Sequence, residues 1–84
     1  MKKIFISSDH AGFNLKDHIK KRFSKKYKFE DLGTNNSRVS VNYPDYAHKL
    51  CKKVILNNEN KGILVCGSGM GMSMAANKHK KIRA

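Results

Sequence analysis

The sequence predicts an α/β fold, a Rossmann-like three-layer α/β/α arrangement with a parallel sheet that stops after its third βα unit. Three short apolar runs have the length and composition of buried strands, and three stretches with helical periodicity alternate with them. Such alternation is typical of parallel sheets with right-handed crossovers and helices on both faces. A chain of 84 residues forms one small domain at most, so we assign 1–84 to a single, partial domain.

The first βα unit occupies the amino-terminal third of the chain. A strand is expected at 3–8 around an Ile-Phe-Ile triplet, and a turn at 9–12 follows its carboxyl end. A helix is expected at 13–26, because apolar residues recur there every fourth position. The face of this helix that is expected to contact the sheet carries Leu15, Ile19 and Phe23.

The second unit begins with a strand at 27–32, which Gly33 ends, and a polar loop is expected at 34–42. Pro44 suits the first turn of the next helix, because its missing N–H would be unpaired there in any case. The apolar stripe of that helix consists of Tyr46, Ala47, Leu50, Cys51, Val54 and Ile55.

The third unit has a strand at 63–65 and a helix from Met70 to about Lys78. After it, 82–84 resembles the opening of a fourth strand. A three-stranded parallel sheet leaves an unpaired strand edge, which is an association hazard. The methionines at 70, 72 and 74 are expected to fill the core and the turn.

The turn between the third strand and the third helix carries the strongest functional signal. Glycines at 67, 69 and 71 allow a sharp turn that points N–H groups at one spot, and the helix start adds partial positive charge. Such a site suits a phosphate or an oxyanion that forms during a reaction. Cys66 at the strand end would share this field, which favours a reactive thiolate. Alternatively, the glycines form only a tight turn and Cys66 packs as a small apolar residue.

A second turn is expected beside the first. If the second and third strands flank the first, the carboxyl ends of the first and third strands meet at a topological switch point, where ligands bind. Asp9 and His10 follow the first strand, and Cys66 and Gly67 follow the third. These two turns are therefore expected to face one crevice. Asp9 could instead serve only as a helix cap, and Tyr43 could serve only in packing.

The formal net charge of +12 favours an anionic partner, which could be a nucleic acid, an anionic surface or an anionic small molecule. The lysines are spread along the chain, mainly on the expected outer faces of helices, and no nucleic-acid-binding motif is present. We therefore expect a solvated basic surface without a specific nucleic-acid site. No apolar stretch approaches the length of a membrane span, so no membrane partner is expected.

The two cysteines, at 51 and 66, fit neither a disulfide framework nor a zinc motif. This usage predicts a reducing, cytoplasmic location. Cys51 lies on a helical stripe and is expected in the core. His18, His48 and His79 are expected in helices without paired partners, and we assign them no role.

Four segments of the chain, taken in order, resemble the ribose-5-phosphate isomerase B family, which also includes the galactose-6-phosphate isomerase subunits. The resemblance covers the whole chain. The segments are Ser8-Asp9-His10-Ala11-Gly12-Phe13 with Leu15-Lys16, Asp31-Leu32-Gly33-Thr34, Tyr43-Pro44-Asp45-Tyr46-Ala47, and Gly62 to Gly71 with its continuation through Ala75-Ala76-Asn77-Lys78 to Ile82-Arg83-Ala84.

The resemblance implies an aldose–ketose isomerase that interconverts ribose 5-phosphate and ribulose 5-phosphate through an enediolate, in the non-oxidative branch of the pentose phosphate pathway. It implies no metal and no cofactor. It also implies that Cys66 is the base, that Ser68 assists proton movement, and that full-length family members are homodimers. The implied substrate contacts are Asp9, His10, Tyr43, Gly67, Ser68, Gly69, Met70 and Gly71.

Family members are longer than this chain, and the resemblance implies that their remaining part supplies a ring-opening histidine and phosphate-binding arginines. A smaller departure is Asn42, where the family usually has an acidic residue. Two further hypotheses therefore stand beside the isomerase. The chain could be a truncated, non-catalytic fragment that at most binds sugar phosphates, or a basic nucleic-acid-binding domain.

Overall fold

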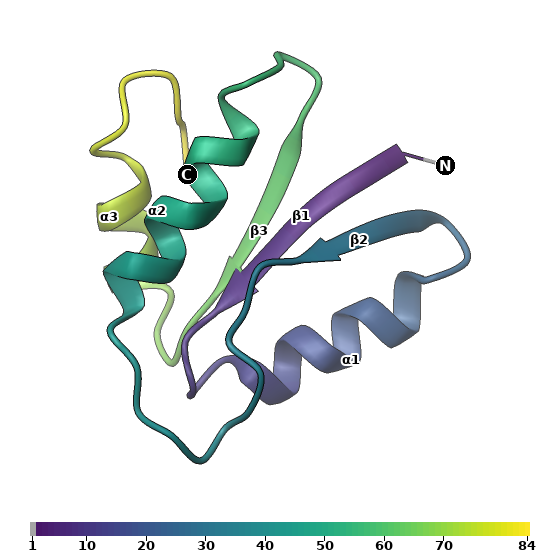
Figure 1. Cartoon of the computed structure of the whole chain (residues 1–84), viewed down its shortest axis with the longest axis vertical. Coiled ribbons are helices and arrows are strands. Elements are labelled where there is room, and N and C mark those ends of the chain that lie inside the picture. The colour runs from purple at the N-terminus through teal and green to yellow at the C-terminus, as the bar shows by residue number, and fades with distance from the viewer. Residues whose placement is uncertain (1) are drawn as a thin grey trace.

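The computed structural model describes residues 2–84 and shows three parallel strands alternating with three helices (Figure 1). This order confirms the predicted α/β fold. Along the chain the elements are β1 (Lys2–Ser8), α1 (Phe13–Phe23), β2 (Tyr27–Asp31), α2 (Tyr43–Val54), β3 (Lys61–Val65) and α3 (Met70–Ala76).

The strand order is β2-β1-β3, as the switch-point argument required. In the register of the sheet, Ile6 of β1 lies between Asp31 of β2 and Ile63 of β3, and Ser8 pairs with Val65. The central strand is the most deeply buried, with Phe5 and Ile6 almost fully covered. Since all three strands run the same way, the carboxyl ends of β1 and β3 reach the same edge of the sheet (Figure 1).

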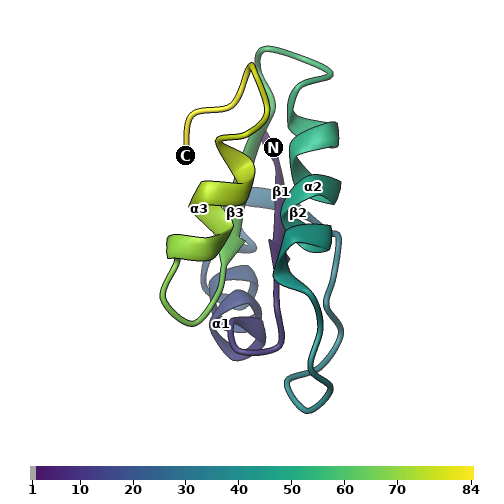
Figure 2. The same cartoon turned by 90° about the vertical axis from the view of Figure 1, so that its left-hand side faces the viewer.

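Helices cover both faces of the sheet, and Figure 2 shows α1 and α2 on opposite sides of the strands. The Ser7 hydroxyl donates to the Tyr46 carbonyl at 3.2 Å, which places α2 against one face of β1. α3 packs on α2, and Ala47, Met72 and Ala75 form a buried cluster between them. The stripe predicted for the second helix is confirmed at its centre, where Ala47, Leu50 and Cys51 are buried.

The orientation of α1 differs from the prediction. Leu15 is 55 % exposed and Phe23 is 41 % exposed, whereas Lys16 is only 1 % exposed. Gly12 lies so close to β3 that an added Cβ would approach the Val65 carbonyl, and this contact sets the rotation of the helix. Lys16, one turn later, then faces the sheet. The prediction that the lysines lie mainly on outer surfaces is therefore wrong for Lys16.

The carboxyl-terminal segment also differs from the prediction. Residues 82–84 form no strand. Instead, the Asn77 side chain accepts from the Ala84 amide at 2.8 Å and donates to its carbonyl at 3.2 Å. Among the methionines, Met72 is buried, but Met70 and Met74 are 68 % and 65 % exposed. They lie two residues to either side of Met72 on α3, and positions two apart point to different sides of a helix.

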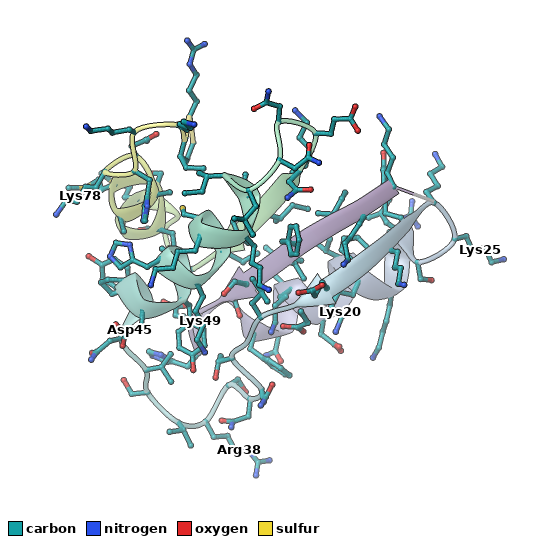
Figure 3. All side chains as sticks on the ribbon, turned by 45° about the horizontal axis from the view of Figure 1, so that its top comes forward. Lys20, Lys25, Arg38, Asp45, Lys49 and Lys78 are labelled. Atoms are coloured by element: carbon teal, nitrogen blue, oxygen red, sulfur yellow. The ribbon has the colours of Figure 1, made fainter. Side chains whose placement is uncertain are left out.

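Basic side chains are distributed widely. Figure 3 shows the labelled residues Lys20, Lys25, Lys49 and Lys78 on separate segments of the molecule. Between residues 2 and 84, no helix has the length and apolar character needed to cross a membrane.

Candidate functional site

Two turns meet where β1 and β3 end. The Asp9 amide donates to the Val65 carbonyl at 3.2 Å, so the chain after β1 continues along the end of β3. A Cβ placed on Gly67 would lie 3.6 Å from the Ala11 Cβ, which is ordinary van der Waals contact. The predicted meeting of the Asp9–His10 turn with the Cys66–Gly67 turn is thus what the structure has.

Asp9 is buried, and its carboxylate organises the first turn. Its Oδ1 accepts from the Gly12 amide at 2.9 Å, just before α1 begins. A Cβ on Gly12 would lie 2.4 Å from the Val65 carbonyl oxygen, so only glycine permits this approach. Asp9 thus holds the turn before α1, whose N-cap residue is Gly12 with no side-chain cap hydrogen bond. A contact between Asp9 and a ligand stays a prediction.

Cys66 is half-buried at the end of β3, and its sulfur is held by the glycine turn. The Gly69 amide donates to Sγ at 3.0 Å, and Gly69 has a φ of +79°, in the left-handed region that glycine tolerates best. The Cys66 side chain also packs against the cluster of Ala47, Met72 and Ala75. It therefore has one side in the core and another at the turn.

The outer part of the turn is open to solvent. Ser68 and Met70 are exposed, and the Met70 amide donates to the Ser68 hydroxyl at 3.2 Å. A Cβ on Gly71 would lie 2.8 Å from two carbons of the Tyr43 ring and 3.2 Å from its hydroxyl oxygen. The first residue of α2 thus places a phenol directly against the start of α3. Whether Tyr43 contacts a ligand there or only packs stays a prediction.

His10 links the first turn to the long loop between β2 and α2. Its Nδ1 accepts from the Val41 amide at 3.3 Å. A neutral imidazole with Nδ1 as acceptor carries its proton on Nε2, which remains a donor. This loop contact is what positions the half-buried ring.

An ion pair with a buried lysine connects α1 to the end of β2, next to the candidate site. The sequence analysis missed this ion pair. Lys16 Nζ donates to Asp31 Oδ1 at 2.7 Å and to the Thr34 carbonyl at 2.5 Å. The Thr34 amide in turn donates to the Ser8 carbonyl at 3.0 Å, which ties the loop after β2 to the end of β1. The available signal was the position of Lys16, one helical turn after the glycine that closes onto β3.

Asp31 accepts several hydrogen bonds in this network. Partial burial would raise the pKa of its carboxyl, but hydrogen bonds from Lys16, Lys20 and the Gly33 amide outweigh burial and lower the pKa below its ordinary value of 3.8. Asp31 therefore stays ionised and pairs with the buried ammonium.

Two further features of the described part of the chain concern metal binding and the shape of its surface. Over residues 2–84, no three His, Cys, Asp or Glu side chains gather closely enough to hold a metal ion together. A hollow of about 570 Å³ lies along the outer edge of β3, between α2 and α3, and its lining includes Gly69.

The candidate site at the two turns consists of the Cys66 thiol, the Ser68 and Tyr43 hydroxyls, the His10 imidazole, the Asp9 carboxylate and the amides of the glycine turn.

Known proteins share the sequence pattern and the fold of this chain. A family model described as Ribose/Galactose Isomerase matches residues 4–84. The chain is 36 % identical over 85 residues to a D-erythrulose-4-phosphate isomerase of Mycolicibacterium smegmatis, covering 98 % of this chain and 56 % of the relative. The chain spans about half the length of the curated relatives that it matches.

Two solved structures are similar to this chain in both fold and sequence. A ribose 5-phosphate isomerase of Thermotoga maritima superposes with a TM-score of 0.91 at 47 % identity, covering 98 % of this chain and 57 % of that one. The ribose-5-phosphate isomerase B of Mycoplasma genitalium, solved with bound ribulose 5-phosphate, superposes with a TM-score of 0.85 at 44 % identity, covering 93 % and 53 %.

Proposed function

This chain belongs to the ribose/galactose isomerase family, and from that premise we propose that it carries the Cys66 half of a sugar-phosphate isomerase active site. The reaction is the interconversion of ribose 5-phosphate and ribulose 5-phosphate through an enediolate. Two relatives are named for ribose 5-phosphate and one for D-erythrulose 4-phosphate, so isomerisation of a phosphorylated sugar is common to the three names.

Cys66 is the proposed base. As thiolate, it removes the proton from C2 of the open-chain aldose, and the electron pair moves to form the C1–C2 double bond with negative charge on O1. Returning the proton to C1, while a proton passes from O2 to O1, yields the ketose. Ser68, two residues along the same turn, is proposed to relay the proton between the oxygens.

The turn amides are proposed to stabilise the enediolate oxygen. Preorganised donors around a developing charge contribute strongly to catalysis, and loss of one costs on the order of 100-fold in rate. The observation that carries the proposal is the 3.0 Å contact between the Gly69 amide and Cys66 Sγ. It places the thiol and the donor turn within one small volume, against the turn that follows Asp9.

Asp9, His10 and Tyr43 are proposed to contact the sugar phosphate, together with Gly67 to Gly71. His10 Nε2 and the Tyr43 hydroxyl supply donors to an anionic ligand, and the net charge of +12 favours its approach. We also propose that 1–84 is a partial domain, that its location is cytoplasmic, and that the full-length protein is a homodimer.

A second function is favoured by one observation, namely that the chain spans about half of its relatives' length. In this case the chain binds sugar phosphates without converting them. The amides from Gly67 to Gly71 would then respond to ribose 5-phosphate in an NMR titration although no ribulose 5-phosphate forms.

The test is isomerisation of ribose 5-phosphate by the purified chain beside its Cys66→Ala and Cys51→Ala variants. The proposal expects turnover that falls by about 10²–10⁴-fold in Cys66→Ala, because a positioned base contributes that much. Cys51→Ala is the matched control, since it removes the other thiol, which lies in the core. Equal rates in wild type and Cys66→Ala would refute the assignment of the base. Binding without turnover in any of the three would support the second function.

A further inference from the structure

Two histidines outside the candidate site face each other across the junction of α2 and α3. His48 Nδ1, on α2, lies 2.7 Å from His79 Nε2, in the turn that follows α3. The ring centroids are 4.9 Å apart and the rings are tilted by 60°. The expectation that these residues lack paired partners is therefore wrong for His48 and His79. No sequence pattern indicated the contact, because the two residues are 31 positions apart.

We propose that His48 and His79 form a two-imidazole binding site for a divalent transition-metal ion of the Zn²⁺, Ni²⁺ or Cu²⁺ class. Imidazole nitrogen is a preferred ligand for these ions. Without metal, one nitrogen donates a hydrogen bond to the other, so one of them must carry a proton. When a metal ion binds, the ring that donated loses this proton to water and takes one up on its other nitrogen, and the lone pairs of both facing nitrogens bind the ion.

The distances suit this exchange. Adjacent ligands at 2.0–2.1 Å from one metal ion are separated by about 2.9–3.4 Å in octahedral or tetrahedral geometry. The observed 2.7 Å therefore has to open by only a few tenths of an ångström. Both side chains are half-buried rather than fully enclosed, so we expect rotation about their side-chain bonds to provide this change.

The scaffold on both sides of the pair is anchored. Ala47, next to His48, is fully buried, and Ala75 packs with it in the α2–α3 cluster. The His79 amide donates to the Ala76 carbonyl at 3.0 Å, which holds the turn against the end of α3. Because the backbone already holds both histidines in place, little conformational entropy is lost when the two rings bind a metal ion.

Positive side chains lie near the pair in the sequence, with Lys78 and Lys80 on either side of His79. Lys49 follows His48, but its ammonium lies over the Tyr46 ring, 5.0 Å from the centroid. With no cluster of three candidate ligands over residues 2–84, the remaining coordination positions fall to water. The site would therefore bind metal with moderate affinity and connect α2 to the segment after α3.

The test is titration of the full chain with Zn²⁺. Binding is monitored through the histidine ring signals in NMR spectra and by calorimetry. We expect the His48 and His79 ring nitrogens to shift together, with a midpoint of thermal unfolding that rises with metal concentration, since the ion binds the folded state. Shifts confined to His10 or His18, or no shift at all, would overturn the proposal in the unmodified chain.

Variants sharpen the test. His48→Gln and His79→Gln should each weaken binding by about tenfold or more, because one ligand then acts without the effective concentration of the other. The double variant should lose little beyond either single change. His18→Gln is the matched control, since that residue is exposed on α1. The same measurements in a Cys66→Ala background remove the competing thiol, and affinity that depends on Cys66 rather than on the pair would refute the site.

Discussion

The two cysteines occupy regions that are built in different ways. Cys51 is fully buried between α2 and the end of α3, with Sγ 4.0 Å from the Ala76 carbonyl, and burial raises the pKa of its thiol. Cys66 is half-buried at the end of β3, with a backbone amide directed at its sulfur. The core around Cys51 is made by side-chain packing, whereas the turn after Cys66 depends on the left-handed backbone of Gly69. The proposed base thus lies where backbone conformation, rather than core packing, determines the geometry.

The largest expected difference between the two regions is in thiol reactivity. Iodoacetamide should modify Cys66 about a thousandfold faster than Cys51, because modification of Cys51 requires opening of the core. Peptide mass spectrometry of the time course measures both rates in one sample. Comparable rates in the folded chain would show that the core around Cys51 opens freely, and the Cys66→Ser and Cys51→Ser variants identify each signal.

A methyl group at Gly12 should break the strand-end region. The Cβ would meet the Val65 carbonyl oxygen, which belongs to the backbone and cannot rotate away. Gly12→Ala is expected to lower the free energy of unfolding by about 3 kcal/mol, as overpacking does at its upper range. Gly67→Ala is the matched control, with ordinary contact to Ala11 and a much smaller loss. Urea unfolding followed by circular dichroism compares them, and equal losses would contradict the close approach.

Removal of the Asp31 carboxylate should lower the free energy of unfolding, because Asp31 pairs with Lys16 next to the strand ends. Asp31→Asn leaves the buried Lys16 ammonium without its carboxylate partner, at a cost of about 2 kcal/mol near neutral pH. The folded-state pKa of Asp31 lies below the ordinary value of 3.8, so its contribution is present above that pH and is lost as pH falls through the lowered pKa. Unfolding free energies of both proteins measured from pH 7 to pH 2 should therefore converge in acid. A difference that is constant across this range would rule out the ion pair as its cause.

The smallest expected effect concerns the conformation of the turn alone. Gly69 has a φ of +79°, and a Cβ added there would have no atom within 4 Å. Gly69→Ala should cost about 1 kcal/mol from backbone strain alone, whereas Gly69→Asn should cost less, because asparagine tolerates this region better. Thermal unfolding of the two variants measures the order, and a reversed order would show that the turn is not left-handed at this residue.

Much of the fold follows from local patterns in the sequence. The order of strands and helices, the turn at 9–12 and the glycine turn after Cys66 were all predicted from periodicity and from residues with special backbone preferences. The meeting of the two turns followed from the parallel sheet order. The roles of Cys66, Ser68 and the other candidate contacts remain predictions, because geometry alone does not report a reaction.

What the sequence by itself determined is therefore the alternating α/β order and the placement of a cysteine and glycines after a strand, since both depend on neighbours along the chain. Tertiary structure alone decided the rotation of α1, the burial of Lys16 against Asp31, and the pairing of His48 with His79. Each of these depends on contacts between segments far apart in sequence. The physical reason is that packing selects which side of a helix is covered, and a close backbone contact such as that of Gly12 with Val65 can outweigh an apolar stripe.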